Sequence, residues 1–62
     1  MFQPTVTRGD TITIYGLIDA QTYTGQLVKK VNPLYWEANV QGESWMVSWS
    51  DTDARWEGGK SE

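Results

Sequence analysis

The residues of this 62-residue chain that are best equipped for chemistry are its aromatic side chains, four Trp and three Tyr. Alternation along the predicted strands places three tyrosines on outward faces or at loop edges, and one tryptophan closes a strand next to a turn. Large, flat side chains of this kind dominate the energetics of protein interfaces. We therefore predict a partner-binding surface made of Tyr15, Tyr23, Tyr35 and Trp49.

The basic residues offer a second kind of site. The candidate phosphate contacts are Arg8, Lys29, Lys30 and Arg55. Two or three such charges would give weak binding with a shallow salt dependence. The net charge of −3 and the pI near 4.6 also argue against a dedicated nucleic-acid binder, which usually carries a basic face. Weak binding of nucleic acid is therefore an alternative hypothesis for the function.

Several classes of site are excluded by composition. The chain has no Cys and no His, which removes disulfides, zinc sites of the usual kind, and Cys–His or Ser–His catalysis. Asp51 and Asp53 could pair on a metal ion, but they fall at a predicted helix start, where the helix dipole favours carboxylates. We expect no metal, no cofactor and no enzymatic activity.

The elements that position these residues are predicted to be short strands. Period-two alternation of apolar and polar residues indicates strands over 11–15, 34–41 and 44–49, and the β-branched and aromatic residues of 23–31 indicate a fourth. A tight hairpin loop over 41–43 joins the last two, with Gly42 free to adopt a positive φ. No apolar stretch approaches the roughly 20 residues that span a bilayer.

The C-terminal part carries the only helix signal. Ser50 could cap a turn with Asp53 three positions on, and Gly58-Gly59 would stop it, so one 3₁₀ turn is expected. Residues 58–62 should be a flexible tail, and residues 1–8 a leader. Leu, Ile, Val and Phe number only 12 of the 62 residues, so Trp36 and Trp45, on inward faces, are expected to supply the core.

The order of these segments resembles an SH3-like small barrel. Gly9-Asp10-x-Ile12-x-Ile14-x-Gly16, followed by Gly25-x-Leu27-x-x-x-Val31, is similar to the entry strands of KOW and Tudor-type modules. The departure is one extra residue between Leu27 and Val31, which a bulge would accommodate. The resemblance covers about residues 9–56 and implies a single all-β domain over 1–62, with about five short antiparallel strands and one C-terminal 3₁₀ turn.

The same resemblance implies where a partner would bind. Tudor-type modules build aromatic cages at the barrel mouth, which here would join Tyr15, Tyr23 and Trp49 with Asp19 or Asp51 in a cation-accepting pocket. We expect a non-enzymatic interaction module that binds a protein partner through this aromatic surface. The alternatives are a weak KOW-like binder of RNA or single-stranded DNA, and an acidic inhibitor of a nucleic-acid enzyme. A chain without Cys or a recognisable secretory leader is expected in the cytoplasm.

Overall fold

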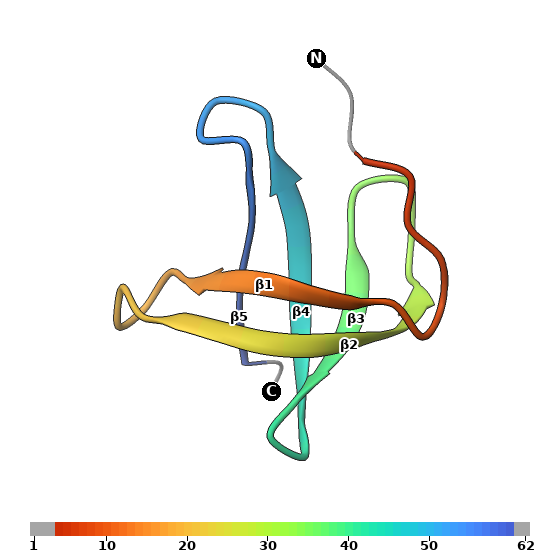
Figure 1. Ribbon diagram of the computed structural model, residues 1–62, viewed down its shortest axis with the longest axis horizontal. Helices are drawn as coiled ribbons and strands as arrows, with labels where there is room; N and C mark the ends of the chain where they lie inside the picture. The colour runs from red at the N-terminus through yellow and green to blue at the C-terminus, as the bar shows by residue number, and fades with distance from the viewer. Residues whose placement is uncertain (1–3, 61–62) are drawn as a thin grey trace.

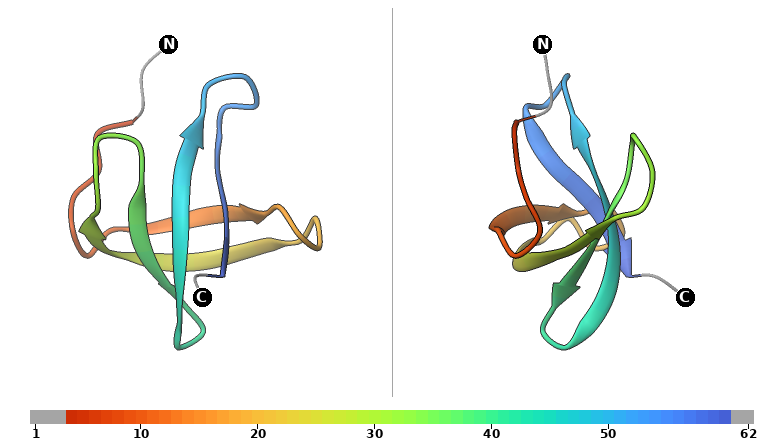
Figure 2. Two further views of the ribbon diagram at one scale, coloured as in Figure 1. Left: turned by 180° about the vertical axis from the view of Figure 1, so that it is seen from behind. Right: turned by 90° about the vertical axis from the view of Figure 1, so that its right-hand side faces the viewer.

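The computed structural model describes residues 4–60 of the chain. They form five strands, which are β1 (Thr11–Gly16), β2 (Thr22–Lys30), β3 (Trp36–Val40), β4 (Glu43–Ser50) and β5 (Arg55–Lys60). The strands close into a barrel in sequence order, so the predicted all-β, SH3-like small barrel is confirmed. The β1–β2 ribbon crosses the sheet of β3, β4 and β5 at a steep angle (Figure 1), and the views from behind and from the side show the same crossing (Figure 2).

The closure of the barrel follows from its strand count. Each strand runs antiparallel to the next along the chain. Because five alternating strands leave the first and last pointing the same way, the pair that closes the barrel, β1 with β5, is parallel over Ile14–Gly16 and Trp56–Gly58. A closed barrel has no free sheet edge along which another chain could add a strand.

The core is built from the inward rows of the strands. Its buried residues are Ile14, Leu27, Trp36, Ala38, Val40, Trp45, Val47 and Trp56. Trp36 and Trp45 were predicted to be core residues and are confirmed, since they are 7% and 8% exposed. No polar or charged residue is buried within residues 4–60. The aromatic bulk therefore replaces the missing aliphatic residues, as the composition suggests.

Strand β2 departs from regular pairing at one place. Leu27 pairs with Ala38 but Lys29 pairs with Glu37, so Val28 is an extra residue and forms a bulge. This confirms the bulge predicted between Leu27 and Val31. Gly25 lies earlier in the same strand, where a Cβ atom would stand 2.8 Å from Cγ2 of Val40. Glycine is thus required there for close packing across the barrel.

The segment after β4 differs from the prediction. Residues 51–54 form a turn, so the 3₁₀ helix expected there is not confirmed, although the Asp53 amide does donate to Ser50 Oγ at 3.2 Å. The turn ends at Ala54, whose φ of 53° is left-handed, and β5 begins at once. The predicted tail over 58–62 is wrong for residues 58–60, which are the second half of β5. The Gly58-Gly59 pair, interpreted as a helix stop, instead lies within β5, where Gly58 allows close contact with β4.

The N-terminal segment is irregular, as expected of the leader, yet it contributes to packing. Val6 is partly buried against the core, and the Gly9 amide donates to the Leu27 carbonyl at 2.8 Å. Residues 1–3 and 61–62, the outer parts of the predicted leader and tail, lie outside the described residues. Over residues 4–60 there is no helix with the length and hydropathy needed to cross a membrane.

Candidate functional site

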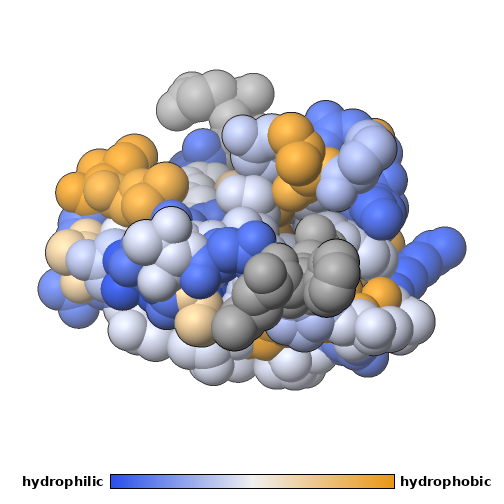
Figure 3. Space-filling view, turned by 90° about the horizontal axis from the view of Figure 1, so that it is seen from above, coloured by the Kyte–Doolittle hydropathy of each residue, from blue (hydrophilic) through white to orange (hydrophobic). Residues whose placement is uncertain are grey.

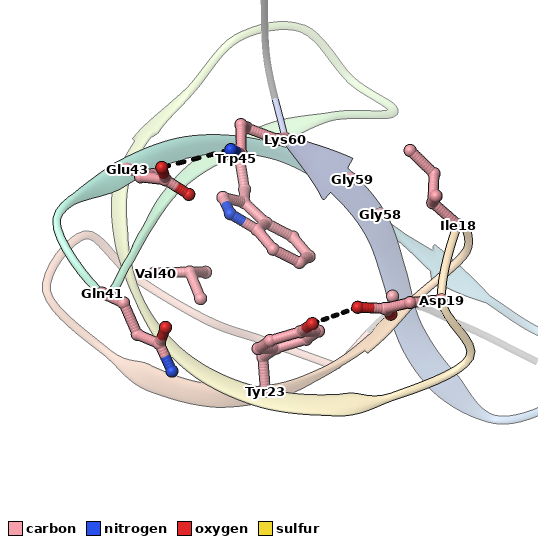
Figure 4. Close-up of a pocket in the computed structure, with 11 residues that line it drawn as sticks. Ile18, Asp19, Tyr23, Val40, Gln41, Glu43, Trp45, Gly58, Gly59 and Lys60 are labelled. Carbon is pink, nitrogen blue, oxygen red and sulfur yellow. Dashed lines mark hydrogen bonds and ion pairs between the residues drawn. The ribbon is translucent and has the colours of Figure 1, made fainter.

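A cavity of about 300 Å³ opens at one end of the barrel (Figure 4). It lies between the β1–β2 loop, the β3–β4 hairpin and the end of β5. Its lining comprises Gly16, Ile18, Asp19, Tyr23, Val40, Gln41, Glu43, Trp45, Gly58, Gly59 and Lys60. A mostly apolar hollow with a few converging polar groups is the usual form of a binding site.

Two aromatic rings line the deep part of the cavity. Tyr23 from β2 and Trp45 from β4 meet with ring centroids 4.8 Å apart and planes tilted by 57°. Trp45 is buried, and its indole N–H has no hydrogen-bond partner within residues 4–60. Trp45 therefore contributes its ring area rather than its donor. The pair leaves an aromatic surface facing the opening.

A carboxylate lies beside these rings. The Tyr23 hydroxyl donates a short hydrogen bond to Asp19, which also accepts the Gln21 amide at 3.1 Å. The Tyr23 hydroxyl, and to a lesser extent that backbone amide, stabilise the ionised carboxylate, so the pKa of Asp19 is lowered. The same bond to Asp19 raises the pKa of Tyr23, because it stabilises the protonated phenol. At neutral pH the cavity thus holds a neutral phenol and an ionised carboxylate.

Glycine keeps this corner of the cavity compact. A Cβ atom on Gly16 would stand 2.8 Å from Oδ1 of Asp19 and 3.0 Å from Cε2 of Tyr23. A Cβ atom on Gly58 would stand 2.2 Å from the Met46 carbonyl oxygen, in the wall shared by β4 and β5. Neither position can accept a larger residue without a shift of its neighbours. Gly16 therefore leaves space for the Asp19–Tyr23 pair, and Gly58 allows β5 to lie close against β4.

The rim combines charge with exposed hydrophobic surface. Lys60 Nζ lies 3.2 Å from a Glu43 carboxylate oxygen, so with Asp19 the lining holds two acids and one base. Leu17 and Ile18 in the β1–β2 loop are 60% and 88% exposed. The view from above shows a hydrophobic cluster at the end of the molecule where this loop lies (Figure 3). An exposed apolar pair beside a cavity is typical of an interaction surface.

The predicted aromatic site residues do not form one site. Tyr23 lines the cavity at the start of β2, beside the β1–β2 loop, and it lies on the inward row of that strand with Gly25 and Leu27. Tyr15 lies on the outside of the barrel, where the Arg55 guanidinium covers its ring at 3.8 Å. Tyr35 and Trp49 line a separate groove at the other end of the barrel. A single cage of Tyr15, Tyr23 and Trp49 is therefore not present.

The predicted phosphate contacts are partly engaged by acidic residues. Arg55 pairs with Glu57 at 2.8 Å and with Asp53 at 3.4 Å, and the hydrogen bond to Glu57 raises the pKa of Arg55. Lys29 lies 3.9 Å from Glu37. Arg8 and Lys30 are exposed and form no ion pair within the described part of the chain. The four cations thus do not act as one free basic patch.

No sequence pattern marks Ile18, Gln41, Glu43 or Lys60 as a site residue, and alternation predicts Trp45 only as a core residue. One signal was available for Tyr23. It has the same parity in β2 as Gly25 and Leu27, which face inward. By contrast, the end of β5 approaches the β3–β4 hairpin because β5 pairs with β4 as far as Trp45 and Lys60, in a segment where the sequence predicts a tail. No protein-family model, curated protein or solved structure matches this chain. Between residues 4 and 60, no three acidic side chains are grouped so as to hold a metal ion.

Proposed function

We propose that this protein is a non-enzymatic binding module that docks a protein partner at the cavity end of the barrel. The observation that carries the proposal is the Tyr23–Trp45 ring pair beside an ionised Asp19, in a cavity of about 300 Å³. Exposed Ile18 at the rim adds apolar contact area. A partner would insert one side chain into the cavity and cover the rim.

The chemistry of the cavity favours a basic side chain. Two carboxylates against one ammonium leave the lining with an excess of one negative charge. An aromatic face attracts a cation through its quadrupole, an interaction worth on the order of 0.5–2 kcal/mol. The acidic net charge of the whole chain would speed encounter with a basic partner. We include in this proposal a relationship to Tudor-type or KOW modules, because the resemblance to Tudor-type modules implies an aromatic pocket that accepts a cation.

The charge distribution favours protein over nucleic acid as the partner. Arg55 and Lys29, two of the four candidate phosphate contacts, are paired with carboxylates that would repel a phosphate backbone. The remaining two would contribute little, since each phosphate contact adds about one unit to the salt slope of binding. A KOW-like nucleic-acid binder therefore has less support.

The proposal is tested by capture of partners from an extract of the source cells on the immobilised protein. Ile18→Ser and Asp19→Asn alter the rim and the charge of the cavity without touching the buried core. Val31→Ser, at a 44% exposed position that lines neither the cavity nor the groove at the other end, is the matched control. We expect one set of captured proteins, enriched in basic segments, to be reduced at least several-fold by both cavity variants and unchanged by the control.

Equal capture by all variants would overturn the proposal. A second measurement addresses nucleic acid directly, by titrating a single-stranded oligonucleotide while recording Trp fluorescence. Quenching of the Trp fluorescence at about 50 mM salt that disappears at about 200 mM would favour nucleic-acid binding instead.

A further inference from the structure

A second hollow lies at the opposite end of the barrel, between the β2–β3 loop and the end of β4. It is an open groove of about 270 Å³ lined by Leu34, Tyr35, Ser48, Trp49 and Asp51. It shares no lining residue with the cavity. Two residues of the predicted aromatic surface, Tyr35 and Trp49, therefore belong to a site that the proposed function leaves unused.

The carboxylate of Asp51 is held at the edge of this groove. The Trp49 indole Nε1 donates to Asp51 Oδ1 at 3.0 Å, which leaves Oδ2 available. Asp51 has no ion-pair partner within residues 4–60, whereas Asp53, two positions on, pairs with Arg55. A fixed, exposed carboxylate without a cation provides charge complementarity for a positively charged group.

The groove walls are formed in advance of binding. Trp49 is half-buried and packs edge-on against Trp56, with centroids 5.7 Å apart and an angle of 70°. The opposite wall is set by Asn32, whose side-chain Oδ1 accepts the amides of Leu34 and Tyr35, each at 2.9 Å. Leu34 and Tyr35 remain 69% and 41% exposed. Walls fixed by packing and by side-chain hydrogen bonds lower the entropy cost of binding.

We propose that this groove binds an arginine side chain of a protein partner. A guanidinium is planar and weakly hydrated, so it can stack on an aromatic face while its N–H groups donate to a carboxylate. The groove offers both contacts within one side chain's reach, the Trp49 and Tyr35 rings and the Asp51 carboxylate. The aliphatic part of the arginine would lie against Leu34. A lysine lacks the planar donor group and would use only the charge.

The test uses ¹⁵N-labelled full-length protein and arginine capped as the N-acetyl amide, with capped citrulline as the neutral isostere. The Trp49 indole resonance is assigned with Trp49→Phe. We expect capped arginine to shift that resonance along a saturating curve and citrulline to bind at least tenfold more weakly. Asp51→Asn, which keeps an oxygen for the indole N–H, should weaken arginine binding about tenfold. The matched control, Asp53→Asn, should leave it unchanged.

Three outcomes would overturn the proposal. They are equal binding of citrulline, insensitivity to Asp51→Asn, and shifts confined to the Trp45 resonance. Shifts confined to Trp45 would at the same time support binding at the cavity proposed above. The experiment can therefore contradict the groove proposal without contradicting the cavity proposal. If Asp51→Asn does not fold, Leu34→Ser and Tyr35→Ala remove exposed walls of the groove and should each weaken arginine binding several-fold. Unchanged binding in both would overturn the proposal equally.

Discussion

The two ends of the barrel each carry a Tyr–Trp pair, but the pairs are built into the fold differently. At the cavity end, Tyr23 and Trp45 come from inward rows of β2 and β4 and pack ring against ring. At the groove end, Tyr35 lies in an exposed loop, and only Trp49 has support from the core. The cavity pair is therefore at once part of the core and part of a site, whereas the groove pair is mainly surface. Removal of the Tyr23 or Trp45 ring should therefore cost stability, whereas removal of the Tyr35 ring should cost mainly binding.

The largest expected effect is in the wall of the cavity. Gly58→Ala would place a Cβ atom 2.2 Å from the Met46 carbonyl oxygen, whereas a Cβ atom on Gly59 would meet only Cδ1 of Ile18 at 4.0 Å. We expect Gly58→Ala to destabilise the fold by about 3 kcal/mol or more, because backbone must shift to accommodate it. Gly59→Ala should change stability by less than about 0.5 kcal/mol. Urea unfolding followed by Trp fluorescence measures both, and equal midpoints would contradict the packing described for β4 and β5.

The next effect compares the two tyrosines directly. Tyr23→Ala removes a ring that packs on Trp45 and the core, and should lower the melting temperature by on the order of 10 °C. Tyr35→Ala removes a ring that is 41% exposed in a loop, and should change it by no more than about 2 °C. Circular dichroism during heating provides the measurement. If Tyr35→Ala were the more damaging change, the distinction between the two ends would be wrong.

A smaller effect is expected from the Asp19–Tyr23 hydrogen bond. The pKa of Asp19 is lowered from 3.8 on folding, so its stabilisation is present above about pH 4 and is lost as pH falls through the folded-state value. The pKa of Tyr23 is raised from 10.0, so its stabilisation is present below about pH 10 and is lost as pH rises further. The bond therefore contributes between these limits.

Tyr23→Phe removes the bond and keeps the ring. The gap in urea midpoint between the unaltered protein and Tyr23→Phe should be widest near neutral pH and should shrink below pH 4. Tyr35→Phe is the control, because within residues 4–60 the Tyr35 hydroxyl has no carboxylate partner like that of Tyr23, and the shift in its urea midpoint should not depend on pH. A constant gap for Tyr23→Phe from pH 2 to pH 7 would mean that Asp19 is not the acceptor.

The difference between the two ends also explains what the sequence could and could not reveal. Alternation and β-branched residues predict four of the strands, and alternation places Trp36 and Trp45 in the core, because inward rows must be apolar. It failed for β5, since Arg55–Lys60 contains two glycines and a single large apolar residue, Trp56. Gly58 is required there because β4 lies close against it, whereas two glycines in succession are typical of a loop when only the sequence is considered. The inward position of Tyr23 follows from its spacing, because Gly25 and Leu27, two and four residues on, both face the core.

The smallest expected change in stability is at the rim, yet it gives the sharpest test of the charge argument. Lys60 and Glu43 are more than half exposed, and an exposed ion pair contributes at most about 1 kcal/mol. Lys60→Gln should therefore leave the melting temperature nearly unchanged while removing the single positive charge from the cavity lining. If the cavity binds a basic side chain, this variant should bind its partner several-fold more tightly at low salt, and the advantage should shrink at high salt because screening weakens exposed charges. Arginine binding in the groove at the other end should not change. Weaker partner binding by Lys60→Gln would instead mean that Lys60 itself contacts the partner, and that the cavity receives an acidic group.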